Sequence, residues 1–230
     1  MNLVVGSCFR NSAGAHVDRY AARLRALAQT CHARGITLHV IAVWGDCVDQ
    51  TEAALWEALR PIPLHQLIVL ERTYGHANYG SSEHPERLAG FAHAANGVFG
   101  TVGDGADAVI YVESDLVWTP EALLAPLADL RAGREIIAIP TFCGPTTTFY
   151  DTWGFRTPDG RRFGALPPYW DALNLRGLTE LGTAGGCLVM RGDVARACRC
   201  DGEALVGFCK DARARGYHVW ADWRVRVEHP

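Results

Sequence analysis

The stretch Ala106-Asp-Ala-Val-Ile-Tyr-Val-Glu-Ser-Asp-Leu-Val-Trp-Thr-Pro120 says most about the fold of this chain. Residues 108–112 form an apolar run of strand length, and two acids follow it at Glu113 and Asp115. Side chains two positions apart in an extended segment point the same way. At the open end of a strand, such a pair can bind a hard divalent cation, and the cation can hold a diphosphate. From this stretch alone, a loop with two solvated acids is an equally good interpretation.

Strand-like and helical segments alternate on both sides of this stretch. We expect strands at 3–7, 36–44, 65–70, 108–112, 135–139, 187–190 and 218–227. We expect helices at 15–34, 51–59, 85–99, 120–130 and 203–215. Thr51 and Thr119 are the expected N-caps, and Gly35 is the expected C′ residue of the first helix. This alternation predicts an α/β fold with a mostly parallel sheet covered by helices on both faces. Ligands of such sheets bind at the carboxyl ends of the strands.

The regular alternation stops between residues 141 and 176. This segment is rich in proline, glycine and aromatic residues, and we expect a long structured loop because the aromatic content argues against disorder. There is no internal repeat or linker, so a single domain over residues 1–230 is predicted.

Composition limits the class of protein. Of the 230 residues, 49% are hydrophobic and 20% are charged, which predicts a sizeable core. No apolar run approaches the roughly 18 residues of a membrane span, and we expect a soluble, cytoplasmic protein. The eight cysteines mostly lie in apolar runs, as buried reduced thiols do. The net charge is −6 over residues 1–155 and +3 over residues 156–230. A basic C-terminal third favours an anionic ligand, although the excess of arginine over lysine also fits genome composition.

Six segments carry a resemblance to a known class of enzymes. In chain order they are Ser7-Cys-Phe9-Arg10-Asn11, residues 87–97, Glu113-Ser114-Asp115, residues 182–190, Asp201-Gly-Glu203 and Val225-Arg-Val-Glu-His229. Together they resemble the GT-A class of nucleotide-sugar glycosyltransferases over nearly the whole chain. The resemblance implies a nucleotide-sugar-binding half at 1–140 and an acceptor-side half at 141–230.

The resemblance also implies roles for individual residues on the donor side. The residues implied to contact the nucleotide sugar are Ser7, Phe9, Arg10, Arg87, Asn96, Glu113, Ser114 and Asp115. Glu113-Ser114-Asp115 stands where the class has its Asp-x-Asp motif, so Asp115 is the implied metal ligand and Glu113 contacts ribose or a metal-bound water. The terminal His229 is implied to be a further metal ligand. A histidine together with carboxylates suits Mn²⁺ somewhat better than Mg²⁺.

On the acceptor side, the small residues Gly185 and Gly186 are implied to let the backbone approach a sugar closely. An acid at the start of the final helix is implied to bind or deprotonate the acceptor hydroxyl, and either Asp201 or Glu203 fits that role. A narrower match, Phe149-Tyr150-Asp151-Thr152-Trp153 followed by Arg156, resembles fungal capsule-associated α-mannosyltransferases. It implies a sugar pocket formed by Tyr150, Asp151, Trp153 and Arg156, although a buried aromatic core with an Asp–Arg pair explains the same residues.

The sequence therefore predicts a metal-dependent hexosyltransferase that uses a UDP- or GDP-sugar and a saccharide or small-molecule hydroxyl acceptor. Three alternatives stay open: transfer to hydroxymethylated bases of DNA, a sugar nucleotidyltransferase, and a non-catalytic nucleotide-sugar binding module. The residues do not decide between retention and inversion at the sugar.

Overall fold

The computed structural model describes residues 1–75, 77, 83–169 and 177–230. The strands are β1 (Asn2–Phe9), β2 (Thr37–Trp44), β3 (Gln66–Glu71), β4 (Ala108–Val112), β5 (Ile136–Ala138), β6 (Thr141–Cys143), β7 (Leu178–Leu181), β8 (Cys187–Arg191), β9 (Val219–Asp222) and β10 (Val227–His229). The helices are α1 (Ala15–Ala33), α2 (Thr51–Leu59), α3 (Pro85–Thr101), α4 (Pro120–Leu124), α5 (Leu127–Arg131), α6 (Gly192–Ala197) and α7 (Leu205–Ala214).

The main sheet of the described residues has the strand order β3-β2-β1-β4-β8-β5-β9-β7, and β6 and β10 form a small parallel sheet beside it. The four strands β1 to β4 are all parallel to one another. Strand β8 runs antiparallel to its neighbours β4 and β5. The predicted mostly parallel α/β sheet is confirmed. Because β8 is inserted between β4 and β5, the two sequence halves 1–140 and 141–230 share one sheet.

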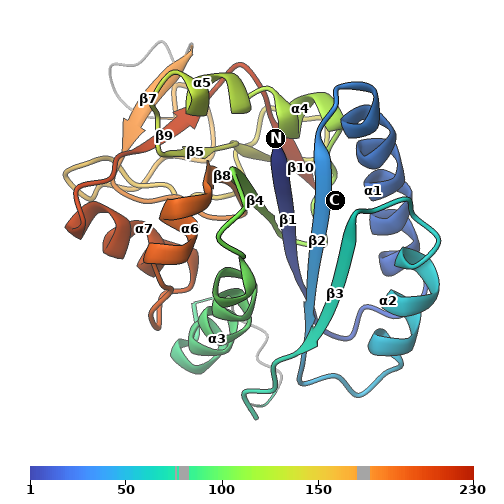
Figure 1. Cartoon of the computed structure of the whole chain (residues 1–230). Helices are drawn as coiled ribbons and strands as arrows, with labels where there is room; N and C mark the ends of the chain where they lie inside the picture. The colour runs from blue at the N-terminus through green and yellow to red at the C-terminus, as the bar shows by residue number, and fades with distance from the viewer. Residues whose placement is uncertain (76, 78–82, 170–176) are drawn as a thin grey trace.

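Two hydrophobic layers cover the faces of the sheet. Helices α1 and α2 lie on one face, and α3, α6 and α7 lie toward the other (Figure 1). Strand β4 is buried along its whole length: Ala108, Ile110 and Val112 pack into the first layer, and Val109 and Tyr111 pack into the second. This alternation follows from the two-residue repeat of an extended strand. It fixes the direction in which the chain leaves β4, and therefore the position of the acids after it.

Four sequence predictions about local structure need correction. The helix predicted at 120–130 is divided into α4 and α5 at Pro126, because proline cannot donate the backbone hydrogen bond of a helix interior. Thr51 is the first residue of α2, and its hydroxyl bonds Asp49 instead of capping the helix. The final helix begins at Leu205, not at Glu203. The strand predicted at 218–227 is two strands, β9 and β10.

Other local predictions are confirmed. The Thr119 hydroxyl accepts a hydrogen bond from the Ala122 N–H at 3.2 Å, as an N-cap does. Gly35, just after α1, has a φ of +65°, the left-handed conformation in which many helices end. All eight cysteines are free thiols.

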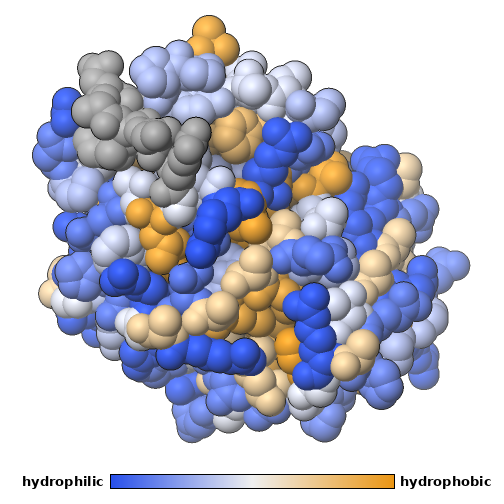
Figure 2. All heavy atoms as spheres, turned by 90° about the horizontal axis from the view of Figure 1, so that it is seen from above, coloured by the Kyte–Doolittle hydropathy of each residue, from blue (hydrophilic) through white to orange (hydrophobic). Residues whose placement is uncertain are grey.

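The surface carries scattered apolar side chains. Val48 and Leu166 are largely exposed, and the face in Figure 2 shows small groups of hydrophobic residues between hydrophilic ones. No helix in the described part of the chain is long and apolar enough to cross a membrane.

Candidate functional site

The loop after β4 and the last strand, β10, meet at one edge of the sheet. Val117 donates to the Glu228 carbonyl at 2.7 Å, and Glu228 donates to the Val117 carbonyl at 2.8 Å. This pair of backbone bonds places the imidazole Nε2 of His229 3.5 Å from Oδ2 of Asp115. Two residues 114 positions apart in sequence, each implied by the resemblance to bind a metal, therefore face each other.

The chemistry of this pair fits a divalent cation. A carboxylate oxygen and an imidazole nitrogen suit Mn²⁺, and Mg²⁺ sites commonly combine one or two protein ligands with oxygens of the substrate phosphates. Within the described residues, no group of three or more His, Cys, Asp or Glu side chains is arranged to hold a metal. Asp115 and His229 together offer one carboxylate and one imidazole to such an ion.

The Tyr150 ring holds the His229 imidazole in place. The two rings stack with centroids 3.9 Å apart and an interplanar angle of 12°. Tyr150 remains 44% exposed, so the ring also offers a free surface beside the histidine. Such a surface can pack against the apolar face of a sugar ring.

Three carboxylates gather at this edge. Burial raises the pKa of the Glu113 carboxyl to about 8, and the charges of Asp115 and Asp151 raise it further, while the Arg87 guanidinium opposes them. Burial likewise raises the pKa of the Asp151 carboxyl to about 7, against hydrogen bonding from backbone N–H groups. Carboxylates that repel one another in a desolvated site are stabilised by a bound cation. Glu113, Asp115 and Asp151 therefore form one electrostatically coupled cluster.

Asp151 lies against two glycines. Its Oδ1 accepts a hydrogen bond from the Gly154 N–H at 2.9 Å, and the Gly185 N–H also acts on this carboxyl and opposes the rise of its pKa. A Cβ at Gly185 would lie 2.8 Å from Oδ2. A Cβ at Gly186 would lie 3.1 Å from the Thr141 hydroxyl. The small residues predicted to admit a sugar are thus already required by contacts within the protein.

The residues predicted at the end of β1 to contact the nucleotide make contacts within the protein. The buried Ser7 hydroxyl donates to the Val112 carbonyl at 2.7 Å and bonds the Tyr20 hydroxyl at 2.9 Å. The Phe9 ring is buried against Tyr20. Arg10 Nε donates to the Asp46 carbonyl at 3.2 Å. Ser7 and Phe9 are therefore buried within the fold, whereas Arg10 is half-buried.

Arg87, in the first turn of α3, extends over the Phe91 ring at 4.9 Å from its centroid. Its charge lowers the pKa of both Glu113 and Tyr150, which places the guanidinium on the same side of the molecule as the carboxylates. The positive charge of Arg87 therefore partly offsets the negative charge of the acidic cluster.

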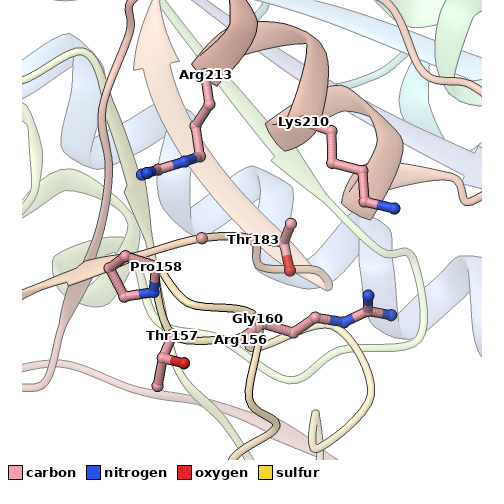
Figure 3. A pocket seen from close by; sticks show the side chains of 8 residues that line it. Arg156, Thr157, Pro158, Gly160, Thr183, Lys210 and Arg213 are labelled. Carbon is pink, nitrogen blue, oxygen red and sulfur yellow. The ribbon is translucent and has the colours of Figure 1, made fainter.

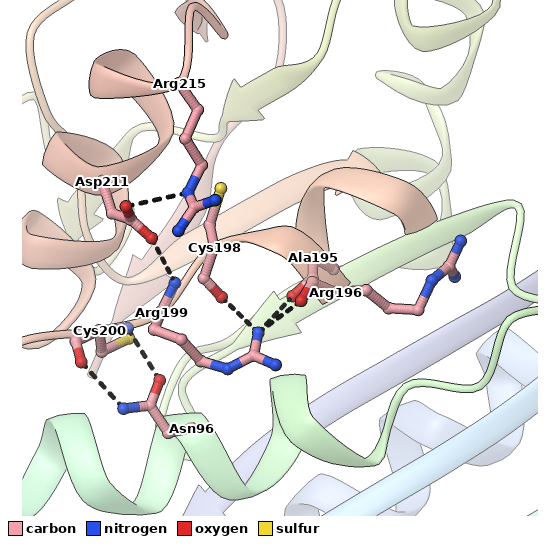
Figure 4. A network of polar contacts seen from close by, with 8 residues as sticks. All are labelled: Asn96, Ala195, Arg196, Cys198, Arg199, Cys200, Asp211 and Arg215. Carbon is pink, nitrogen blue, oxygen red and sulfur yellow. Dashed lines mark hydrogen bonds and ion pairs between the residues drawn. The ribbon is translucent and has the colours of Figure 1, made fainter.

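Asn96 has a structural role. Its Nδ2 donates to the Cys200 carbonyl at 2.9 Å, and its Oδ1 accepts from the Cys200 N–H at 2.8 Å (Figure 4). Both polar ends of the amide are used to attach the segment before α7 to α3. These bonds use one N–H and one oxygen lone pair of the amide, so the contact of Asn96 with the nucleotide stays a prediction.

The two acids predicted on the acceptor side lie in the turn before α7. Asp201 Oδ1 accepts from the Glu203 N–H at 2.9 Å, and a Cβ at Gly207 would overlap that oxygen. Glu203 forms an ion pair with Lys210 on α7. Asp201 therefore stabilises the turn, whereas the carboxylate of Glu203 extends from the turn to Lys210 on α7.

His16 was not among the predicted site residues. Its Nε2 lies 3.2 Å from the Ser114 hydroxyl, so it contacts the middle residue of the Glu113-Ser114-Asp115 segment. Burial lowers the pKa of the imidazole, and the charge of Asp115 opposes this shift. The sequence signal was its position in the first turn of the helix that follows β1, because that turn starts at the same edge of the sheet.

Comparisons with known proteins give the fold but no family. No family model matches the chain, and no curated protein matches it. Among solved structures, the chain is similar to S. aureus TarS, with a TM-score of 0.54 and 12% identity over 99% of this chain and 36% of that one. It is similar to mouse xyloside xylosyltransferase 1, with a TM-score of 0.50 and 10% identity over 100% and 98% of the two chains. It is also similar to a nucleoside-diphosphate-sugar pyrophosphorylase from Vibrio cholerae, with a TM-score of 0.55 and 9% identity over 96% and 91%.

The chain thus spans about a third of TarS and nearly all of the xylosyltransferase and the pyrophosphorylase. At these identities the similarity establishes the fold: a single α/β domain of the kind predicted.

Proposed function

We propose that this protein is a metal-dependent glycosyltransferase that transfers a sugar from a UDP- or GDP-sugar to a hydroxyl acceptor. The observation that carries the proposal is the 3.5 Å approach of His229 Nε2 to Asp115 Oδ2 at the carboxyl end of β4. Ligands of doubly wound sheets bind at this edge. The fold similarity to a xylosyltransferase supports the same conclusion.

In this proposal Asp115 and His229 hold Mn²⁺ or Mg²⁺, which when bound neutralises the negative charge of the diphosphate leaving group. Tyr150 orients the imidazole through the stacked rings. Glu113 lies beside the donor, where it accepts a hydrogen bond from ribose or from water. Arg10 and Arg87 provide positive charge for the nucleotide. Ser114 is oriented by its contact with His16.

On the acceptor side, Glu203 is the better of the two predicted acids for binding or deprotonating the acceptor hydroxyl. Asp201 already accepts the Glu203 N–H and packs on Gly207, whereas the carboxylate of Glu203 is held by a side chain, Lys210, that can reorient. An inverting reaction uses such a base, and a retaining reaction does not require it.

The competing function is nucleotidyl transfer, because the fold is also similar to that of a nucleoside-diphosphate-sugar pyrophosphorylase. That reaction calls for a Gly-rich, cationic phosphate loop after the first strand. The segment after β1, Ser7 to Gly14, contains one arginine, no lysine and a single glycine. The residues of this loop therefore favour glycosyl transfer.

The test is the release of nucleoside diphosphate from a panel of UDP- and GDP-sugars, with Mn²⁺ and with EDTA. We expect metal-dependent release that Asp115→Asn and His229→Gln each reduce by at least ~100-fold, since several kcal/mol of charge stabilisation is lost at ~1.4 kcal/mol per factor of ten. Asp104→Asn is the matched control, because its exposed carboxylate precedes β4 at the opposite edge.

Absence of metal-dependent release with every donor would overturn the proposal. Formation of pyrophosphate from a nucleoside triphosphate and a sugar phosphate would assign nucleotidyl transfer instead. Binding of a donor without turnover would assign a binding module. Hydroxymethylated DNA is tested as an acceptor beside saccharides.

A further inference from the structure

A pocket of about 250 Å³ opens between the loop after Trp153 and helix α7. Its charged lining residues are Arg156, Lys210 and Arg213, and the remaining lining comes from Thr157, Pro158, Gly160, Gly182 and Thr183. Figure 3 shows Lys210 and Arg156 extending toward the same side of the pocket from opposite walls, with the Thr183 side chain between them. Three cations and no acid line this pocket.

The positive charge is only partly compensated. Arg213 pairs with Glu180 at 3.3 Å and donates to the Leu181 carbonyl at 2.9 Å. Lys210 pairs with Glu203, whose carboxylate is partly exposed. Arg156 has no ion pair among the described residues. Its Nε donates to the Trp153 carbonyl at 3.4 Å, and its guanidinium lies 5.7 Å from the centroid of the Trp153 ring. The Arg156 guanidinium therefore keeps most of its hydrogen-bonding capacity.

The hydrogen-bonding groups of the pocket select the chemistry of its ligand. The Gly182 and Thr183 N–H groups donate to the Arg156 carbonyl, and the Thr183 hydroxyl donates to the Gly154 carbonyl at 2.7 Å. The donors left for a ligand are the side chains of Arg156 and Lys210, together with the N–H groups of Arg213 other than those on Nη1. A guanidinium and an ammonium that approach one space bind an oxyanion, because the planar fork matches two oxygens of a phosphate or carboxylate. The volume is below the range of complete small-molecule sites, so it suits one such group.

The pocket adjoins the candidate active site along the chain. Thr183 lines the pocket, Gly185 contacts the Asp151 carboxylate, and the Gly186 carbonyl accepts the Glu113 N–H at 2.9 Å. Three residues of extended chain span at most ~11 Å. The backbone at the wall of the pocket therefore lies within this distance of the backbone that bonds Glu113.

The geometry points to this pocket as the subsite for an oxyanion carried by a small acceptor, so that the substrate class is a phosphorylated or carboxylated saccharide. The inference rests on the proposed function for the acceptor role. The binding of the oxyanion itself requires neither donor nor metal. The paired acid Glu203 is then at the rim of the acceptor subsite, bound to a lysine that contacts the same ligand.

The first test measures binding to the full chain by calorimetry without donor or metal, with inorganic phosphate, glucose 6-phosphate, glucuronic acid and glucose as probes. We expect the charged probes to bind and glucose not to bind, and the stronger of the phosphate and carboxylate probes identifies the group. Arg156→Gln should weaken binding about tenfold or more, as expected for a charge-assisted hydrogen bond. Arg215→Gln, at the end of the same helix α7 but outside the pocket, should leave it unchanged.

Equal binding of phosphate by Arg156→Gln and Arg215→Gln, or no binding of any charged probe by the intact chain, would overturn the inference. Preference for duplex DNA over all small probes would also overturn it. The second test uses donor and Mn²⁺: Arg156→Gln should raise KM for the charged acceptor, whereas Arg215→Gln should leave this KM and the donor hydrolysis without acceptor unchanged. If the protein hydrolyses the donor but its anion binding does not depend on Arg156, the oxyanion subsite is refuted and the proposed function stands. If anions bind but no donor is turned over, the proposed function is refuted.

Discussion

Replacing Asn96 by alanine distinguishes a structural residue from a nucleotide contact. The change removes two hydrogen bonds, from Nδ2 to the Cys200 carbonyl at 2.9 Å and from the Cys200 N–H to Oδ1 at 2.8 Å. These bonds attach the segment before α7 to α3 across 104 positions of sequence. The backbone of Cys200, which is only 7% exposed, would then lack partners for both its N–H and its carbonyl.

The expected cost follows from these contacts. Each lost hydrogen bond contributes ~0.5–1.5 kcal/mol, and a buried backbone group left without a partner adds to this loss. We expect Asn96→Ala to lower the free energy of unfolding by about 2–4 kcal/mol. For a domain of this size, this corresponds to a midpoint of thermal unfolding lower by roughly 5–10 °C. Asn96→Asp keeps the acceptor for the Cys200 N–H, so it should cost less.

Urea unfolding followed by circular dichroism measures the stability, and titration with nucleoside diphosphate measures the affinity of the folded variant. We expect the stability to fall and the affinity to change little. Unchanged stability together with a loss of nucleotide affinity would refute the reasoning, and it would support the nucleotide contact implied by the sequence resemblance.

Three further changes test other parts of the structure. Thr119→Ala removes the side-chain cap of α4 and should cost ~1 kcal/mol in urea unfolding, and an unchanged midpoint would contradict the cap. Tyr150→Ala removes the ring stacked on His229 and should raise the Mn²⁺ concentration needed for half-maximal donor hydrolysis ~10-fold. Tyr150→Phe keeps the ring and should leave this concentration unchanged. Equal effects of the two variants would refute the stacking role. Burial raises the pKa of Asp151 from 3.8 to about 7, so between these pH values the native state retains a proton that the unfolded state loses. The contribution of this group to the free energy of unfolding is therefore complete below pH 4. It falls by up to ~1.4 kcal/mol per pH unit as the pH rises to 7. Asp151→Asn should remove this part of the pH dependence of unfolding, and an identical pH profile for the variant would contradict the raised pKa.

The sequence predicted the position of the acids after β4 better than it predicted the start of the final helix. The position of Glu113 and Asp115 follows from one buried strand and the turn after it, both of which are local features. Glu203 depended on where a helix begins, and the turn 201–204 instead bonds Asp201 to the Glu203 N–H and delays α7 to Leu205. Helix starts are set by competing capping bonds of similar energy, which the periodicity of apolar residues does not resolve.

Asn96 shows a second limit of sequence reasoning. An amide on a helix before the acidic segment has the same pattern whether it binds a nucleotide or a carbonyl of the protein. In the structure, a backbone segment 104 positions away returns to α3 and bonds one donor and one acceptor of the amide. Ser7 is similar, since its hydroxyl is bonded to the Val112 carbonyl of the neighbouring strand.

The sequence by itself determined that the chain is an α/β domain and that two acids follow its most buried strand, because strand and helix periodicity are local properties of the apolar pattern. Only the tertiary structure brought His229 to Asp115, because the contact depends on the backbone pairing of Val117 with Glu228. The cationic pocket of Arg156, Lys210 and Arg213 was also decided by packing, since it lies between a loop and a helix whose separation no local pattern encodes.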